Sequence, residues 1–223
     1  MSGPFLCVLE DTLTGIHVGP RNIKTAVIAC ADAVIIYVTS QLDIPNIQNA
    51  IDTSAAASGA RFNVAMSKAM AIDSWDTSTN ILNIPYHTEI KILGIHYTIT
   101  VHQSAKNNWT TVTGNIGAQT RNAYNRDLCL DKRIMYVHNF LLTKTWNTAQ
   151  IFRKPEDRKR QISMVIAWFL WQGDIFRVPL STLQQQKQQG VWGFINIAAK
   201  IRALFFYRLQ PQGQENATIT TEC

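Results

Sequence analysis

The stretch Ile28-Ala29-Cys30-Ala31-Asp32-Ala33-Val34-Ile35 places a single acid between two short apolar runs. Each run is rich in Val, Ile and Ala and has the length of a β-strand, so the pattern predicts a β-hairpin with Asp32 at its turn. A carboxylate in so apolar a setting must be solvated, paired or bound to a cation, because desolvating an unpaired charge is costly. Asp32 is therefore the first candidate for catalysis or metal binding. On these residues alone, an acid that merely tops an exposed hairpin is the alternative.

The residues on both sides of the hairpin predict further short elements. An apolar stripe at helical spacing runs over 1–13, and Asp43 can cap a helix that ends at Ser58-Gly59. A short strand is predicted over 68–72, and a strand or tight hairpin over 89–100 bends at Gly94. The first hundred residues therefore mix helices with antiparallel hairpins.

From Ser104 onward the apolar period becomes helical. One helix carries a stripe that includes Trp109 and Ile116, and a second, which Asp131 can cap, carries Ile134, Val137 and Leu141. A third helix is predicted from Pro155 to Gly173, and a final amphipathic helix over 196–209. The fold class is α+β, with a helical bundle in the second part of the chain.

Charge and composition narrow the function classes. The 223 residues carry a net charge of +6, and residues 101–160 hold eleven Lys or Arg against four Asp or Glu. Such a local excess is what contacts to a phosphate backbone require, although an ordinary solvated face looks the same. No apolar run is long enough to span a bilayer, and the scattered cysteines predict reduced thiols. We therefore expect an intracellular protein, in the nucleus or cytoplasm, with no membrane partner and no small-molecule cofactor.

The order of three motifs resembles the palm of reverse transcriptases from non-LTR (LINE-type) retrotransposons. These motifs are the Asp32 hairpin, the segment Ser58-Gly59-Ala60-Arg61-Phe62-Asn63 after a helix, and Lys91-Ile92-Leu93-Gly94. In that family the turn carries a Tyr-Ala-Asp-Asp type signature, whose four places are taken here by Cys30, Ala31, Asp32 and Ala33. The second aspartate position is therefore alanine.

The resemblance implies a site for nucleotide and primer. Asp32 would be the catalytic, metal-binding carboxylate for two Mg²⁺ ions, which need several hard oxygen ligands. The remnants of the nucleotide and primer site would be Ser58, Gly59, Asn63, Ser67, Lys68, Lys91, Leu93 and Gly94. Met66 stands where the family has a lysine, and Lys68 lies close by. Because Ala33 cannot bind a cation and the first catalytic aspartate would lie upstream of Met1, we expect no productive Mg²⁺ site.

The resemblance also divides the chain. It implies a truncated palm over 1–100, an all-α thumb-like bundle over 101–173, a post-thumb segment over 174–209 and a disordered tail over 210–223. The thumb would contact an RNA template and DNA primer, or an RNA–DNA hybrid, through basic side chains. These candidates for nucleic-acid binding are Arg121, Arg126, Lys132, Arg133, Lys144, Arg153, Lys154, Arg158, Lys159 and Arg160.

Two functions from different classes follow. The first is a fragment of a retrotransposon RNA-directed DNA polymerase, catalytically inactive because of Ala33 and the missing upstream motifs. The second is a non-catalytic nucleic-acid-binding or scaffold protein derived from a retroelement. No P-loop, Gly-rich dinucleotide turn or Ser/His/Asp grouping suggests another enzyme.

Overall fold

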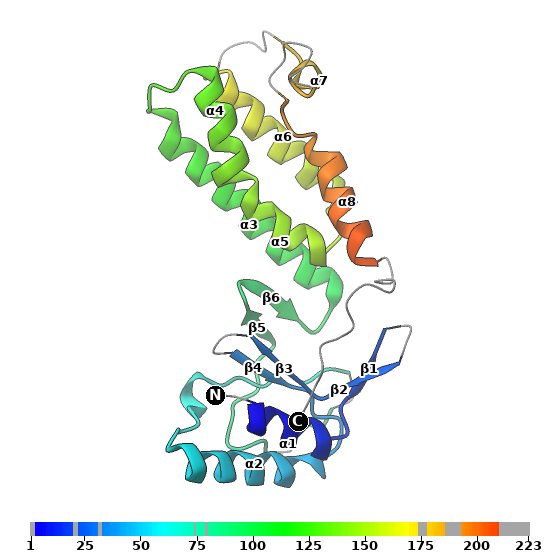
Figure 1. Cartoon of the computed structure of the whole chain (residues 1–223). Coiled ribbons are helices and arrows are strands. Elements are labelled where there is room, and N and C mark those ends of the chain that lie inside the picture. The colour runs from blue at the N-terminus through cyan, green and yellow to red at the C-terminus, as the bar shows by residue number, and fades with distance from the viewer. Residues whose placement is uncertain are drawn as a thin grey trace. The chain divides into compact units, whose positions relative to one another are not determined.

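The computed structural model describes residues 3–19, 22–30, 33–73, 75–78, 80–173, 178–185 and 193–209. It confirms the α+β class, because the described antiparallel hairpins all lie before Thr100, among helices, and the described elements after it are helical. The chain divides into two compact units, one that contains the described residues up to Ile99 and one that contains those from Thr100 onward. Figure 1 labels the helices and strands of both units. The predicted tail over 210–223 lies outside the described residues.

The first unit is built on two helices and a hairpin. Helix α1 (Gly3–Thr12) packs against α2 (Asp43–Ser58), and Leu9, Leu13, Ala26, Ile47 and Ala50 form the buried core between them and the hairpin. Helix α2 ends where the sequence predicts, because Gly59 takes a left-handed conformation and its N–H donates to the Ala55 carbonyl. A short 3₁₀ helix, η1 (Val64–Met66), follows.

The strands of this unit pair in sequence order, within the part that the structure describes, as three separate two-stranded antiparallel sheets. The pairs are β1 (Ile16–Val18) with β2 (Ile23–Thr25), β3 (Val27–Cys30) with β4 (Ala33–Ile36), and β5 (Glu89–Ile92) with β6 (Ile95–Thr98). The β3–β4 register pairs Cys30 with Ala33, which confirms the predicted hairpin around residues 31 and 32. The prediction of a strand over 68–72 is wrong, because only Ala69 bridges, to Tyr86.

Two acidic side chains, buried Asp43 and half-buried Glu10, connect the elements of the first unit. The Asp43 side chain is 3% exposed and accepts from the Thr14 N–H and hydroxyl and from the Ser40 N–H, at 3.0–3.2 Å. The prediction that Asp43 caps α2 is therefore wrong, because its carboxylate accepts hydrogen bonds from Thr14 and Ser40, which lie outside the helix. Glu10 of α1 similarly accepts from the N–H groups of Ala26 and Val27 at the start of β3. Cys7 of α1 is disulfide-bonded, which corrects the prediction of a reduced thiol.

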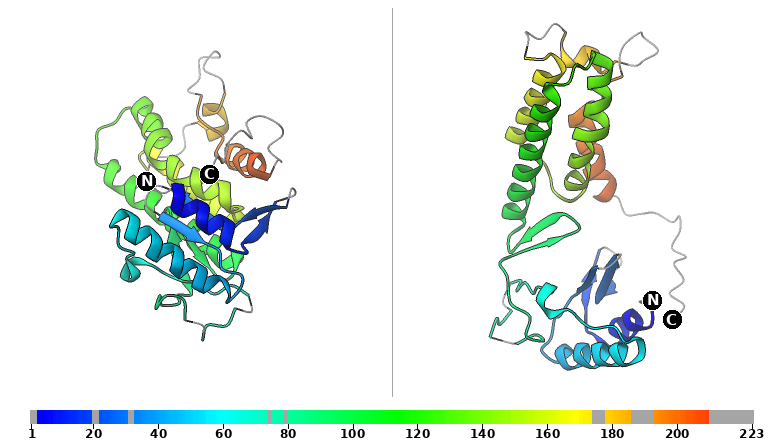
Figure 2. Two further views of the ribbon diagram at one scale, coloured as in Figure 1. Left: turned by 60° about the horizontal axis from the view of Figure 1, so that its bottom comes forward. Right: turned by 90° about the vertical axis from the view of Figure 1, so that its left-hand side faces the viewer.

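The second unit is a helical bundle, seen from two further directions in Figure 2. Its helices are α3 (Val101–Tyr124), α4 (Leu130–Tyr136), α5 (Thr143–Ile151), α6 (Glu156–Leu170), α7 (Leu180–Leu183) and α8 (Ile197–Leu209). Helix α3 packs on α6, and α5 packs on α8. The predicted apolar stripe of α3 is confirmed, because Trp109 and Ile116 are buried, and α6 adds the buried Ile162, Ile166 and Leu170.

One segment of the bundle departs from the predicted helices. Between α4 and α5 the backbone widens into a π-helical segment, η2 (Val137–Leu141), in which the Leu142 N–H donates to the Val137 carbonyl. Val137 and Leu141 are buried as predicted, so the apolar pattern of one continuous helix concealed this insertion. His138 fixes the segment to the next part of the chain, because its ring stacks on Phe194 and its Nε2 accepts from the Ile195 N–H.

Candidate nucleic-acid interface

The polymerase-type site of the prediction centres on Asp32, which lies outside the described residues. The described strands β3 and β4 lead into and out of the turn that contains it. Among the side chains that the structure describes, no group of three or more His, Cys, Asp and Glu could hold a metal ion. The Mg²⁺ site therefore stays a prediction from the sequence resemblance.

The predicted remnants of the nucleotide and primer site occupy three separate segments, each held by local contacts. The Ser58 hydroxyl, at the end of α2, donates to the Ser54 carbonyl. Asn63 caps η1 by accepting from the Met66 N–H, and the Ser67 hydroxyl donates to the Asn63 carbonyl.

The other predicted residues of this group are exposed. Lys68 follows η1, and Lys91 lies on β5 opposite His96. Leu93 and Gly94 form the turn between β5 and β6, both with positive φ, and the Leu93 side chain is exposed. A bulky residue with positive φ is unusual, and the pair gives the turn the φ signs of a type I′ hairpin. The prediction that this turn belongs to a primer site therefore rests on the sequence resemblance alone.

The predicted basic residues of the second unit separate into two groups. Six are exposed to solvent: Arg121, Arg126, Lys132, Lys144, Arg153 and Arg160. The other four are half-buried and hold contacts within the bundle. Arg133 donates to the Leu170 carbonyl at the end of α6, at 2.8 Å. Lys159 pairs with Glu156 at 3.3 Å.

Lys154 has an enclosed ammonium group. Its Nζ lies 5.5 Å from the centroid of the Trp109 ring, and Trp109 itself is 0% exposed. The Nζ atom is buried and has no hydrogen-bond partner. Burial, with a smaller effect from the Lys159 charge, lowers the pKa of Lys154 to about 8. A side chain so enclosed serves the packing of the bundle rather than a phosphate contact.

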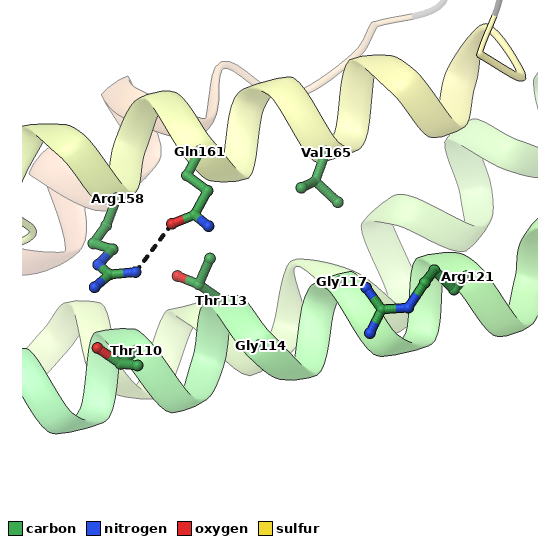
Figure 3. Close-up of a pocket in the computed structure, with 8 residues that line it drawn as sticks. All are labelled: Thr110, Thr113, Gly114, Gly117, Arg121, Arg158, Gln161 and Val165. Atoms are coloured by element: carbon green, nitrogen blue, oxygen red, sulfur yellow. Dashed lines mark hydrogen bonds between the residues drawn. The ribbon is translucent and has the colours of Figure 1, made fainter.

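Two exposed or partly exposed arginines flank a groove between α3 and α6 (Figure 3). The groove has a volume of about 310 Å³. Its walls on α3 are small or polar, namely Thr110, Thr113, Gly114, Gly117 and Arg121, and its walls on α6 are Arg158, Gln161 and Val165. The two guanidinium groups lie toward opposite ends of the groove in Figure 3.

The small residues explain why this groove exists. A Cβ added to Gly114 would meet nothing within 4 Å, and one added to Gly117 would meet only the Arg121 guanidinium at 3.6 Å. The Thr113 hydroxyl turns back to the Trp109 carbonyl, at 2.7 Å. Helix α3 thus leaves open space beside α6 where larger side chains would fill the gap. An incoming backbone can approach the helix surface closely at this point.

The groove is electrostatically suited to anions. Arg158 donates to the Gln161 side chain at 3.0 Å, which fixes its guanidinium beside the groove, and lies 3.5 Å from Asp157. Arg121 is exposed at the other end. Arginine presents a planar fork of donors that matches phosphate oxygens, so each of these two groups can bind a phosphate at its end of the groove.

The sequence prediction included both arginines but missed the groove itself. Thr110 and Gly117 each lie three or four residues from the adjacent pair Thr113 and Gly114, and this spacing places the four on one side of a helix. This spacing could be read from the sequence. The sequence could not show which helix faces these small residues, because α6 begins more than thirty residues later.

No helix within the described ranges is both long and apolar enough to cross a membrane. No protein-family model and no curated protein sequence matches this chain.

Proposed function

We propose that the chain binds nucleic acid through its second unit and does not polymerise. The α3–α6 groove with Arg121 and Arg158 carries the proposal, together with the other five exposed residues among the predicted phosphate contacts, Arg126, Lys132, Lys144, Arg153 and Arg160. Counterion release makes such a surface favourable for a phosphate backbone of any sequence. The resemblance in motif order makes an RNA–DNA hybrid the first ligand to test, and makes a non-LTR reverse transcriptase the proposed ancestor.

The absence of polymerisation follows from residue 33. A two-metal mechanism needs several carboxylate oxygens, and Ala33 supplies none where the related enzymes have the second aspartate. We expect no primer extension on an RNA template with Mg²⁺, for the full chain and for Asp32→Ala alike. Extension by the natural chain that disappears in Asp32→Ala would show that Asp32 still builds a metal site. The proposal that the chain does not polymerise would then be wrong.

The groove predicts a specific loss of affinity. The double variant Arg121→Ala/Arg158→Ala removes both guanidinium groups from the groove, and we expect it to bind an RNA–DNA hybrid about tenfold more weakly near 0.1 M salt. The slope of log affinity against log salt should fall by about 1 to 2, since each lost phosphate contact releases fewer counterions. Fluorescence anisotropy over a salt series measures both quantities.

A matched control separates the groove from general charge. Lys200 and Arg202 are exposed on α8, so Lys200→Ala/Arg202→Ala removes the same charge from the same unit. We expect this control to change the affinity less than about twofold. Equal losses in the two double variants would refute the groove as the binding site. Affinity that does not depend on salt, or none at all, would favour a scaffold that acts through other partners.

A further inference from the structure

A second hollow of the helical unit combines aromatic and basic side chains. It has a volume of about 200 Å³ and lies at the turn from α3 into α4 and along η2. We call it the aromatic pocket; the residues that matter here are Arg126, Lys132, Met135, Tyr136, Asn139 and Phe140. Phe140 is 57% exposed and Met135 61% exposed, so both present apolar surface to solvent at the pocket.

The exposed Phe140 ring is held in place rather than left loose. Its centroid lies 5.1 Å from that of Tyr136, with 30° between the ring planes, and Tyr136 in turn packs on Phe169 of the core. One side of the ring is therefore supported, and much of its surface remains open to solvent.

The π-helical backbone is an independent sign of a built site. Asn139 and Phe140 both belong to η2, whose extra residue changes the direction in which following side chains leave the helix. Such π-helical insertions are rare and are frequently found at functional sites. Here the insertion sits where the structure also exposes an aromatic ring and an amide side by side.

We propose that the aromatic pocket stacks one unpaired nucleobase on Phe140, with Arg126 and Lys132 on the adjoining phosphates. This inference rests on the proposed nucleic-acid binding and adds single-stranded segments to its ligands. Stacking on an aromatic ring accepts every base, because each base has a π-face, and the Asn139 amide offers a donor and an acceptor to the base edge. The pocket is smaller than the range of about 300–1,000 Å³ that is typical of small-molecule sites, which suits a single ring system.

The charges around the pocket favour a nucleotide over a purely apolar occupant. Arg126 and Lys132 are exposed and line the pocket. Their acidic neighbours Asp127 and Asp131 are exposed as well but do not line it. An apolar peptide or helix would offer no negative charge to these two cations. A nucleotide supplies both a flat apolar ring and a phosphate within one residue of chain.

The experiment compares two ligands that differ by unpaired bases. One is a blunt RNA–DNA hybrid, and the other is the same hybrid with a single-stranded overhang that contains 2-aminopurine, whose fluorescence is quenched on stacking. Full-length chains with Phe140→Ala and Phe140→Trp are tested beside Phe206→Ala, which removes another ring, 60% exposed, from α8. We expect the overhang to increase the affinity of the natural chain, and Phe140→Ala to lose about fivefold on the overhang ligand alone.

Each outcome decides the inference. Quenching and overhang affinity that fall in Phe140→Ala but persist in Phe140→Trp and Phe206→Ala would support it. An overhang gain that Phe140→Ala leaves unchanged would overturn it while the binding of blunt hybrid still supported the proposed function. A Phe140→Ala loss that is equal on both ligands would also overturn it, because stacking on an unpaired base cannot affect a blunt duplex. Binding of neither ligand would refute the proposed function and this inference with it.

Discussion

Replacing Asp43 with alanine is expected to lower the free energy of unfolding of the first unit by about 3 kcal/mol. The Asp43 carboxylate is 3% exposed and accepts hydrogen bonds from the Thr14 N–H, the Thr14 hydroxyl and the Ser40 N–H. The three hydrogen bonds are part-buried and each goes to a charged acceptor, a kind of bond that contributes about 1.5–3 kcal/mol. Thr14 is exposed, however, and its freed donors can bind water, so the expected loss is less than the sum of the three. The loss affects the segment that joins α1 to β1 and the turn that precedes α2, so the whole unit should weaken.

A second acid on the same helix provides the control for this prediction. Asp52 is exposed on α2 and accepts from the Gln48 side chain within the helix. We expect Asp52→Ala to change stability by less than about 0.5 kcal/mol, as is usual for surface positions. Hydrogen exchange of peptides from α1 and α2, measured in the full chain, reports on this unit alone. Equal exchange in the Asp43→Ala and Asp52→Ala variants would contradict the structural role assigned to Asp43.

The contrast between these two acids shows how far sequence reasoning could reach. Periodicity located α2 and its end at Gly59, because those features depend on neighbouring residues. It could not show that Asp43 binds Thr14, which lies 29 residues earlier. The two aspartates look alike in the sequence, since both lie on one predicted helix, and only the packing of α1 on α2 makes one of them indispensable.

The basic residues of the second unit illustrate the same limit for the candidate site. Arg133 and Lys154 meet the sequence criteria for phosphate contacts as well as Arg121 does. The structure places Arg133 at the carbonyl end of α6 and Lys154 over Trp109, so both are occupied within the bundle. The side-chain pattern of a helix predicts which face is apolar, but the neighbouring helix decides which cations remain in solvent.

The aromatic pocket could not be predicted, because the π-helical insertion that shapes it has no periodic pattern in the sequence. Ile134, Val137 and Leu141 fit a regular amphipathic helix, and all three are buried. The π-helical insertion became visible only with the backbone, where His138 packs on Phe194 more than fifty residues later. Aromatic residues at exposed positions, such as Phe140, are the one sequence clue that remains once the buried stripe is assigned.

Replacing Lys154 with methionine is expected to stabilise the second unit by about 2 kcal/mol at pH 7. Its Nζ is buried without a hydrogen-bond partner, and the contact with the Trp109 ring compensates only part of the lost hydration. Burial lowers the pKa of Lys154 from 10.5 to about 8. A difference of this size corresponds to about 3 kcal/mol, which solvent screening reduces because the side chain is only half-buried.

The same group predicts how stability depends on pH. Below pH 8 Lys154 is protonated in both the folded and the unfolded state, so the full penalty is present. Between about pH 8 and 10.5 the unfolded chain binds more protons than the folded chain, and the free energy of unfolding must therefore rise with pH. Lys154→Met should lack this rise, so its advantage over the natural chain should shrink across that range.

Lys106→Met, at an exposed position of α3, should keep the rise and change stability by less than about 0.5 kcal/mol. Urea unfolding followed by tryptophan fluorescence suits the test, because five of the six tryptophans follow residue 100. A natural chain whose second unit loses stability between pH 8 and 10.5, relative to Lys154→Met, would show that the ammonium group stabilises the bundle, with the cation–π contact outweighing desolvation.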